Sequence, residues 1–201
     1  MQSPSIFIPI ARCLLLTLSI FWLCASAFAR ENTELVSVLL EMKAQDQAVR
    51  EVIKQSGVDL SQAQVDRITD TDAKHTRQLK AIISEHGWPS VSLVGEDGVQ
   101  AAFLLVQHSP DIAFQKAMLP NILHAYQNNQ GITGQEVALL TDRVLVKTGQ
   151  PQKYGTQADI TPNTVTFFPI ADADDVDKRR AEMGLPPLAD YKKLLEQLYG
   201  K

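Results

Sequence analysis

The chain has 201 residues and a formal net charge of −4 at pH 7, from 19 lysines and arginines against 23 aspartates and glutamates. No stretch is rich in basic residues, which argues against a protein that binds nucleic acid or anionic lipid. Both cysteines, Cys13 and Cys24, fall within the first 29 residues. The remaining chain therefore has no thiol for a disulfide bond, a nucleophile or a metal ligand.

Residues 1–29 have the order of features that is typical of a signal peptide. One charged residue, Arg12, precedes a short apolar run, and small residues follow that end in Ala27-Phe28-Ala29. The apolar run is shorter than the roughly 20 residues of a membrane span. We therefore predict cleavage after Ala29, a single globular domain over 30–201, and an exported protein in the periplasm or outside the cell. It would have no membrane span after cleavage; an uncleaved membrane anchor is the alternative.

Apolar residues recur every three or four positions in the first half of this domain, which predicts helices. The first helix is expected at about 33–56. The second begins after the capping residue Ser61 and stops at Gly87. Asp97 is expected to cap a third helix, whose uninterrupted apolar run at 101–106 is typical of a buried helix.

The next two helices are predicted from their capping residues. Ser109, followed by Pro110, predicts the start of a fourth helix that reaches about residue 128, with a kink or break at Pro120. The spacing of Thr133 and Glu136 is that of a capping box. It predicts a fifth helix that ends near Gly149, although the β-prone residues within 143–147 leave a strand as the alternative.

Over residues 154–170 the helical pattern gives way to short β-prone stretches around a turn, which predicts a small β-hairpin with strands near 157–160 and 165–168. Two further helices are expected at about 174–183 and 187–198. The predicted fold is therefore mainly α: a single domain of about six or seven helices with one small β-hairpin near the C-terminal third.

Polar side chains interrupt the apolar stripes of the first two helices. If these helices pack antiparallel about the turn near residue 58, Asp46 lies opposite residue 71, beside Asp72 and His75. We predict a buried polar cluster of Asp46, Arg50, Asp72 and His75. It is either an ion-pair network that fixes helix register or the wall of a ligand pocket. An Asp-x-x-His metal site is a further possibility, but such pairs are common by chance, and we expect no metal.

A second set of polar residues lies later in the chain. Gln107 and His108 follow the most apolar helix, and Asp142 and Arg143 interrupt another apolar run. A loop at 152–157 carries several hydrogen-bonding side chains around a glycine. We predict that five residues meet in one polar cleft with Gln107 or Gln152 at its edge: His108, Asp142, Arg143, Tyr154 and Gln157. The alternative is that these groups bond only one another and seat the hairpin on the helices.

Five short motifs, in this order, resemble those of a bacterial family of unknown function, many of whose members carry signal peptides. The motifs are Asp46-Gln47-x-x-Arg50, Gln107-His108, Leu140-Thr141-Asp142-Arg143, Gln152-x-Tyr154-Gly155-Thr156-Gln157 and Arg179-Arg180-Ala181-x-x-Gly184-Leu185. The resemblance covers about 46–191. It implies the limits of the domain and singles out these residues, but it implies no reaction.

Three functions are compatible with these observations. The first is a binding or accessory domain of the cell envelope for a small polar or anionic ligand. The second is a hydrolase or lyase that uses a histidine and a carboxylate, with His108, Asp142 and His75 as the candidate catalytic residues. The third is a protein–protein interaction module. The chain has no nucleophile elbow, phosphate-binding glycine loop or dinucleotide fingerprint, and we expect no cofactor.

Overall fold

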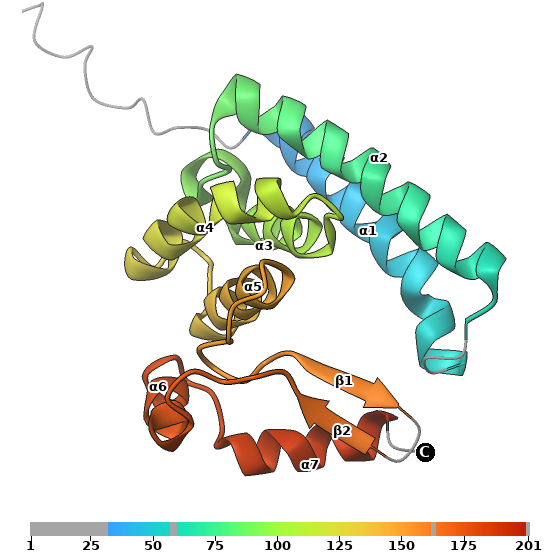
Figure 1. The fold of residues 1–201 in the computed structure, drawn as a ribbon. Coiled ribbons are helices and arrows are strands. Elements are labelled where there is room, and N and C mark those ends of the chain that lie inside the picture. Colours follow the sequence, from blue (N-terminus) through green and yellow to red (C-terminus); the bar gives the residue numbers. More distant parts are fainter. Residues whose placement is uncertain (1–31, 57–59, 162–163, 200–201) are drawn as a thin grey trace, which may run out of the picture. The chain divides into compact units, whose positions relative to one another are not determined.

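The computed structural model describes residues 32–56, 60–161 and 164–199; the predicted signal peptide lies outside these ranges. Within them the fold is mainly helical, as predicted, with seven α-helices, one short 3-10 helix and one β-hairpin (Figure 1). The elements are α1 (Thr33–Ser56), α2 (Gln62–His86), α3 (Val91–His108), α4 (Ile112–Gln127), α5 (Gly134–Lys147), β1 (Ala158–Thr161), β2 (Thr164–Phe167), η1 (Ala173–Asp175), α6 (Val176–Glu182) and α7 (Leu188–Tyr199). None of these helices is long and apolar enough to cross a membrane.

The two long helices α1 and α2 lie side by side and antiparallel, and both pack on α3 (Figure 1). A capping box at Ser61 and Gln64 starts α2. Leu39 of α1 and Leu79 of α2 are fully buried, as is most of the apolar run in α3. The core therefore centres on α3, and α4 and α5 close it from the other side.

Two of the predicted helix starts are wrong. The third helical element begins at Val91 after Ser90 rather than at Asp97, but Gly95 has a non-helical backbone (φ 67°, ψ 174°) and kinks it, so its main part begins just before Asp97. The fourth helix is capped by Asp111, whose side chain accepts a hydrogen bond from Phe114 N at 3.0 Å. Ser109 does not take this role, since its hydroxyl accepts a hydrogen bond from Thr76 of α2.

Two further expectations concern helix interiors. Pro120 lies within α4, and the helix continues across it without a break. The strand considered for 143–147 is wrong, because α5 runs as one helix from its capping box at Thr133 to Lys147. Hydrogen bonds from the amides of Thr148 and Gly149 to carbonyls of the last turn close its end.

The C-terminal third is built around the predicted hairpin. Strands β1 and β2 pair antiparallel, with Ala158 opposite Phe167, and α7 lies along β2 (Figure 1). The rings of Phe167 and Tyr191 stack with their centroids 6.1 Å apart. An aromatic contact thus fixes α7 on the hairpin.

Candidate functional site

A buried carboxylate lies at the centre of a polar cluster between α1, α2, α3 and α5. Asp46 is 0% exposed. It accepts hydrogen bonds from Arg50 Nη1 at 2.7 Å, from Gln47 Nε2 at 2.9 Å and from His108 Nδ1 at 2.8 Å. Three donors from two helices therefore hold this single side chain.

Arg50 joins the two antiparallel helices. Its Nη2 donates to both carboxylate oxygens of Asp72, each at 2.7 Å, while its Nη1 holds Asp46. The structure thus brings together Asp46, Arg50 and Asp72 in the middle of the α1–α2 hairpin. An arginine shared between two carboxylates favours a fixed helix register because its planar fork matches only one arrangement.

The two carboxylates of this cluster have opposite pKa shifts. Burial alone would raise the pKa of Asp46, but the hydrogen bond and charge of His108 and the charge of Arg50 outweigh it, and the pKa falls below the ordinary 3.8. Burial prevails at Asp72 and raises its pKa above 3.8, despite the hydrogen bonds and charge of Arg50. Asp46 therefore stays ionised to a lower pH than Asp72 does.

His75 is buried beside the cluster but forms no hydrogen bond to its carboxylates. Its Nε2 lies 3.3 Å from Gln45 Oε1, and its Nδ1 has no hydrogen-bond partner in the described part of the chain. Burial lowers the pKa of His75 below 6.5, although the charge of Asp46 acts in the opposite direction. The ring is therefore held neutral, which suits a core histidine rather than an ion-pair partner.

His108, at the end of α3, is the histidine of the cluster that is partly exposed to solvent. Its side chain is 21% exposed, and Asp46 holds its Nδ1. Because an ionised Asp46 can only accept, Nδ1 carries the hydrogen. Nε2 forms no hydrogen bond within the described residues, and it can accept a proton when the ring is neutral and donate one when it is charged.

Arg143 approaches the same end of α3 from α5. Its Nη1 donates to the backbone carbonyl of Gln107 at 2.7 Å, and no carboxylate among the described residues pairs with it. Burial lowers the pKa of Arg143 and the nearby charge of Arg50 lowers it further, whereas the charge of Asp72 acts in the opposite direction. Gln107 Oε1 is also buried without a partner in the described ranges. At the end of α3 the Arg143 guanidinium therefore binds a backbone carbonyl, and the buried amide oxygen of Gln107 is left without a partner in the described ranges.

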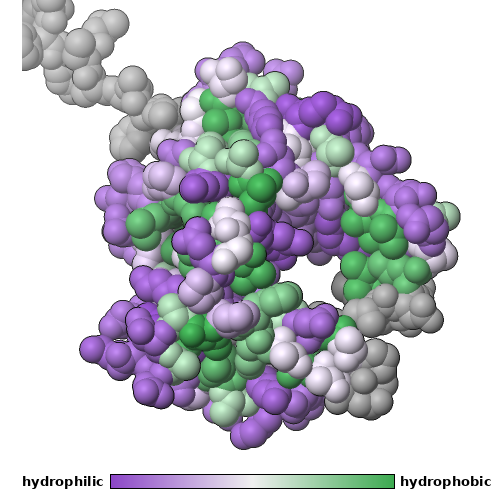
Figure 2. Space-filling view, viewed as in Figure 1, coloured by the Kyte–Doolittle hydropathy of each residue, from purple (hydrophilic) through white to green (hydrophobic). Residues whose placement is uncertain are grey.

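In the space-filling view an open gap separates the α1–α2 hairpin from the β1–β2 hairpin, and the coloured part of its rim carries both polar and apolar residues (Figure 2). No group of three or more His, Asp or Glu side chains suited to hold a metal ion occurs in the described ranges.

Residues 33–201 match a protein family that is described only as a family of unknown function, DUF6624. The chain belongs to this family. No curated protein and no solved structure matches the chain. The match covers nearly the whole predicted domain of this DUF6624 protein, but it assigns no reaction or ligand.

The other predicted site residues form a second network, which is centred on Asp142, the residue before Arg143 in α5. Asp142 is fully buried and accepts hydrogen bonds from the amides of Lys153 (2.7 Å), Tyr154 (3.0 Å) and Thr156 (2.9 Å). It thereby seats the loop before β1 on α5. A buried carboxylate surrounded by amide donors is a structural anchor, because its lone pairs are already occupied.

The side chains of this loop are also bonded mainly to the loop itself. Gln152 donates to the carbonyls of Gln157 and Phe168, each at 2.8 Å, and accepts from Gln157 N at 2.8 Å. Tyr154 lines an apolar pocket of ≈ 540 Å³ with α4 and α5. No hydrogen bond in the described chain joins His108 or Arg143 to Asp142, Tyr154 or Gln157. The DUF6624 protein thus distributes the residues predicted for one cleft over two networks.

Sequence reasoning gave no role to two buried polar residues that hold these networks. Gln115 of α4 donates to the carbonyls of Val106, Gln107 and Ser109 at 3.0–3.1 Å and so fixes the end of α3. Arg180 of α6 donates to the carbonyls of Pro186 and Tyr154 at 2.6 and 2.7 Å. Arg180 could have been singled out because it lies in the motif that begins at Arg179. Gln115 could have been singled out because it is a polar residue within a largely apolar helix.

Proposed function

We propose that this protein binds a small anionic ligand, with a carboxylate or phosphate group, beside Arg143 and His108. The observation that supports this most is the state of Arg143. It is partly buried, it donates to one backbone carbonyl, and the carboxylate whose charge reaches it, Asp72, forms its own hydrogen bonds with Arg50. A cation withdrawn from water without a counter-ion is costly, and a bound anion would offset that cost.

The chemistry of the neighbouring groups supports the same ligand class. The guanidinium can hold a carboxylate or phosphate through two parallel hydrogen bonds. The Nε2 of His108 and the amide of Gln107 lie at the same end of α3 and can add further contacts. Asp46 and Asp72 are already bonded to Arg50, so neither is free to take Arg143.

Isothermal titration with inorganic phosphate and with succinate tests this proposal. We expect the wild-type protein to bind one of them and Arg143→Gln to bind it at least tenfold more weakly. Arg77→Gln is the matched control, since Arg77 is an exposed arginine of α2 without an ion pair in the described structure. Equal affinity of the Arg143→Gln and Arg77→Gln variants, or no binding of either anion to the wild type, would refute the proposal.

The pair of Asp46 and His108 favours a second candidate function, acid–base catalysis on the bound ligand. The carboxylate orients the ring through Nδ1 at 2.8 Å and leaves Nε2 accessible, which is the arrangement of a general base. Hydrolysis of p-nitrophenyl acetate and p-nitrophenyl phosphate provides the assay. Loss of turnover in His108→Gln with anion binding retained would support a catalytic role, whereas no turnover by the wild type would leave the protein a binding domain.

A further inference from the structure

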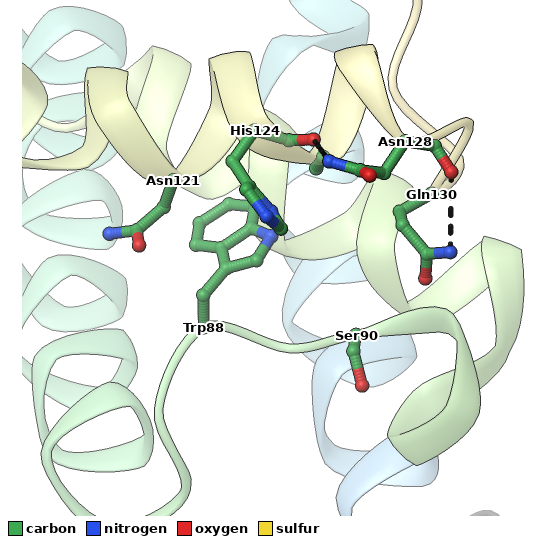
Figure 3. A pocket seen from close by; sticks show the side chains of 7 residues that line it. Trp88, Ser90, Asn121, His124, Asn128 and Gln130 are labelled. Carbon is green, nitrogen blue, oxygen red and sulfur yellow. Dashed lines mark hydrogen bonds between the residues drawn. The ribbon is translucent and has the colours of Figure 1, made fainter.

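A second pocket, of ≈ 410 Å³, lies between the segment that follows α2 and the C-terminal half of α4 (Figure 3). None of its residues belongs to the cluster around Asp46. The residues that line it are Trp88, Ser90, Asn121, His124, Ala125, Asn128 and Gln130. The volume is within the range of small-molecule sites, about 300–1,000 Å³.

The helix supplies one polar face of this pocket. Asn121, His124 and Asn128 are three and four residues apart, so they lie on the same side of α4. Asn128 is held in place, since its Nδ2 donates to the carbonyl of His124 at 2.8 Å. In the close-up, the His124 side chain points from α4 toward Trp88, with Asn121 and Gln130 on either side (Figure 3).

Trp88 forms the opposite wall and leaves a donor unused. Gly87, with a φ of 75°, ends α2 and turns the chain so that Trp88 comes to lie under α4. The indole Nε1 is buried and has no hydrogen-bond partner among the described residues. A buried N–H without an acceptor is costly, so the indole of Trp88 is held here by its apolar contacts rather than by a hydrogen bond.

We propose that this pocket binds a neutral saccharide of one or two rings. None of the seven lining residues is an acid, a lysine or an arginine, and His124 is the one lining side chain that can carry a charge. Its hydroxyl and amide groups both donate and accept, as sugar hydroxyls do. The electron-rich indole face suits the C–H face of a pyranose ring.

Tryptophan fluorescence provides a direct test, because the chain has two tryptophans and the other, Trp22, lies in the predicted signal peptide. In a full-length Trp22→Phe protein, Trp88 is the sole emitter. The probes are glucose, galactose, N-acetylglucosamine, maltose and cellobiose, with glucuronate as the anionic comparison. We expect a saturable change in emission with at least one neutral sugar and a smaller response to glucuronate.

Two exposed pocket residues and one matched control complete the test. In the same background, His124→Ala and Asn121→Ala should each weaken sugar binding at least fivefold. Gln127→Ala, an exposed residue of the same helix outside the pocket, should leave it unchanged. No saturable response to any neutral sugar up to about 50 mM, or equal affinity in all three variants, would overturn the proposal. Tighter binding of glucuronate than of glucose would also overturn it.

Discussion

At the scale of single residues, Asp46 is the side chain on which the cluster depends. We expect Asp46→Asn to lower the free energy of unfolding by about 3 kcal/mol, because Arg50 and His108 lose a buried charged partner while the size of the side chain is kept. Urea denaturation measures this loss. Gln47→Ala is the control, since it removes only the most peripheral of the three donors. Equal unfolding midpoints for the Asp46→Asn protein and the wild type would contradict the role given to Asp46.

His75 makes stability depend on pH. Burial lowers its pKa below 6.5, so the unfolded chain binds a proton more readily than the folded one as the pH falls through that value. Its contribution to stability is therefore present at pH 7.5 and is lost as the pH falls below about 6.5. The charged residues that act on His75 are Asp46, Lys74, Asp72 and Arg50.

Thermal unfolding between pH 7.5 and 5.5 measures this effect. We expect the wild-type melting temperature to decrease over that interval and the decrease to be smaller in His75→Gln. His124→Gln, at an exposed histidine, should keep the wild-type slope. The same slope in the His75→Gln protein as in the wild type would show that other groups cause the pH dependence.

At the scale of elements, α5 joins two networks through adjacent residues. Arg143 contacts the end of α3, whereas Asp142 holds the loop at 153–156. In Asp142→Asn an amide group would face three backbone N–H donors that need an acceptor. We expect hydrogen exchange at 153–156 to become at least tenfold faster while the amides of α1 and α3 stay protected. Unchanged exchange at 153–156 would show that Asp142 does not anchor the loop.

The packing of α7 on the same loop depends on Gly155. Its φ is 69°, and a Cβ there would lie 2.7 Å from Leu188 Cδ1. Gly149 also has a positive φ of 76°, but a Cβ there would meet nothing within 4 Å. Both alanine variants therefore carry backbone strain of about 1 kcal/mol, and only Gly155→Ala adds a collision with α7. We expect Gly155→Ala to be the less stable of the two in urea denaturation, because the Leu188 and Ile170 side chains must shift to make room; equal stability would contradict this packing.

The elements predicted accurately from the sequence are those in which the capping residues and the apolar stripe indicate the same boundaries. Helices α1, α2 and α5 are of this kind, and the gaps in the stripes of α1 and α2 pointed to Asp46 and Asp72. The first turn of α3 was missed because it is separated from the main helix by a kink at Gly95, and the long apolar run lies after that kink. The start of α4 was missed because Ser109 and Asp111 are both good caps, and only the position of Thr76 in space decides between them.

The grouping of the site residues needed information that local patterns do not carry. Adjacent residues on a helix point about 100° apart, so Asp142 and Arg143 serve different partners although they share one motif. The bond between His108 and Asp46 spans 62 residues. No periodicity or capping rule sets the distance between the end of α3 and the middle of α1.

In the molecule as a whole, the apolar core and the polar network around Asp142 lie in different regions. The continuous apolar core consists of residues between Leu35 and Val144, with contributions from all of α1 to α5. In the C-terminal third, the loop at 153–156 is bonded to Asp142 of α5, and Met183 packs against the apolar core. Arg180 joins that loop to the segment after α6. The mature protein has no cysteine to reinforce this attachment if the first 29 residues are removed.

Cleavage of the predicted signal peptide, residues 1–29, can be measured directly. We expect a bacterial host that exports the full-length chain to yield a protein that begins at Arg30, because small residues at 27 and 29 follow a short apolar run. Intact-mass measurement of the exported protein identifies the first residue. Ala29→Arg should block cleavage and leave the precursor in the cell, since the cleavage site requires a small side chain, whereas Asn32→Ala, beyond the site, should be processed normally. A full-length wild-type chain recovered from the membrane fraction would instead support the uncleaved anchor.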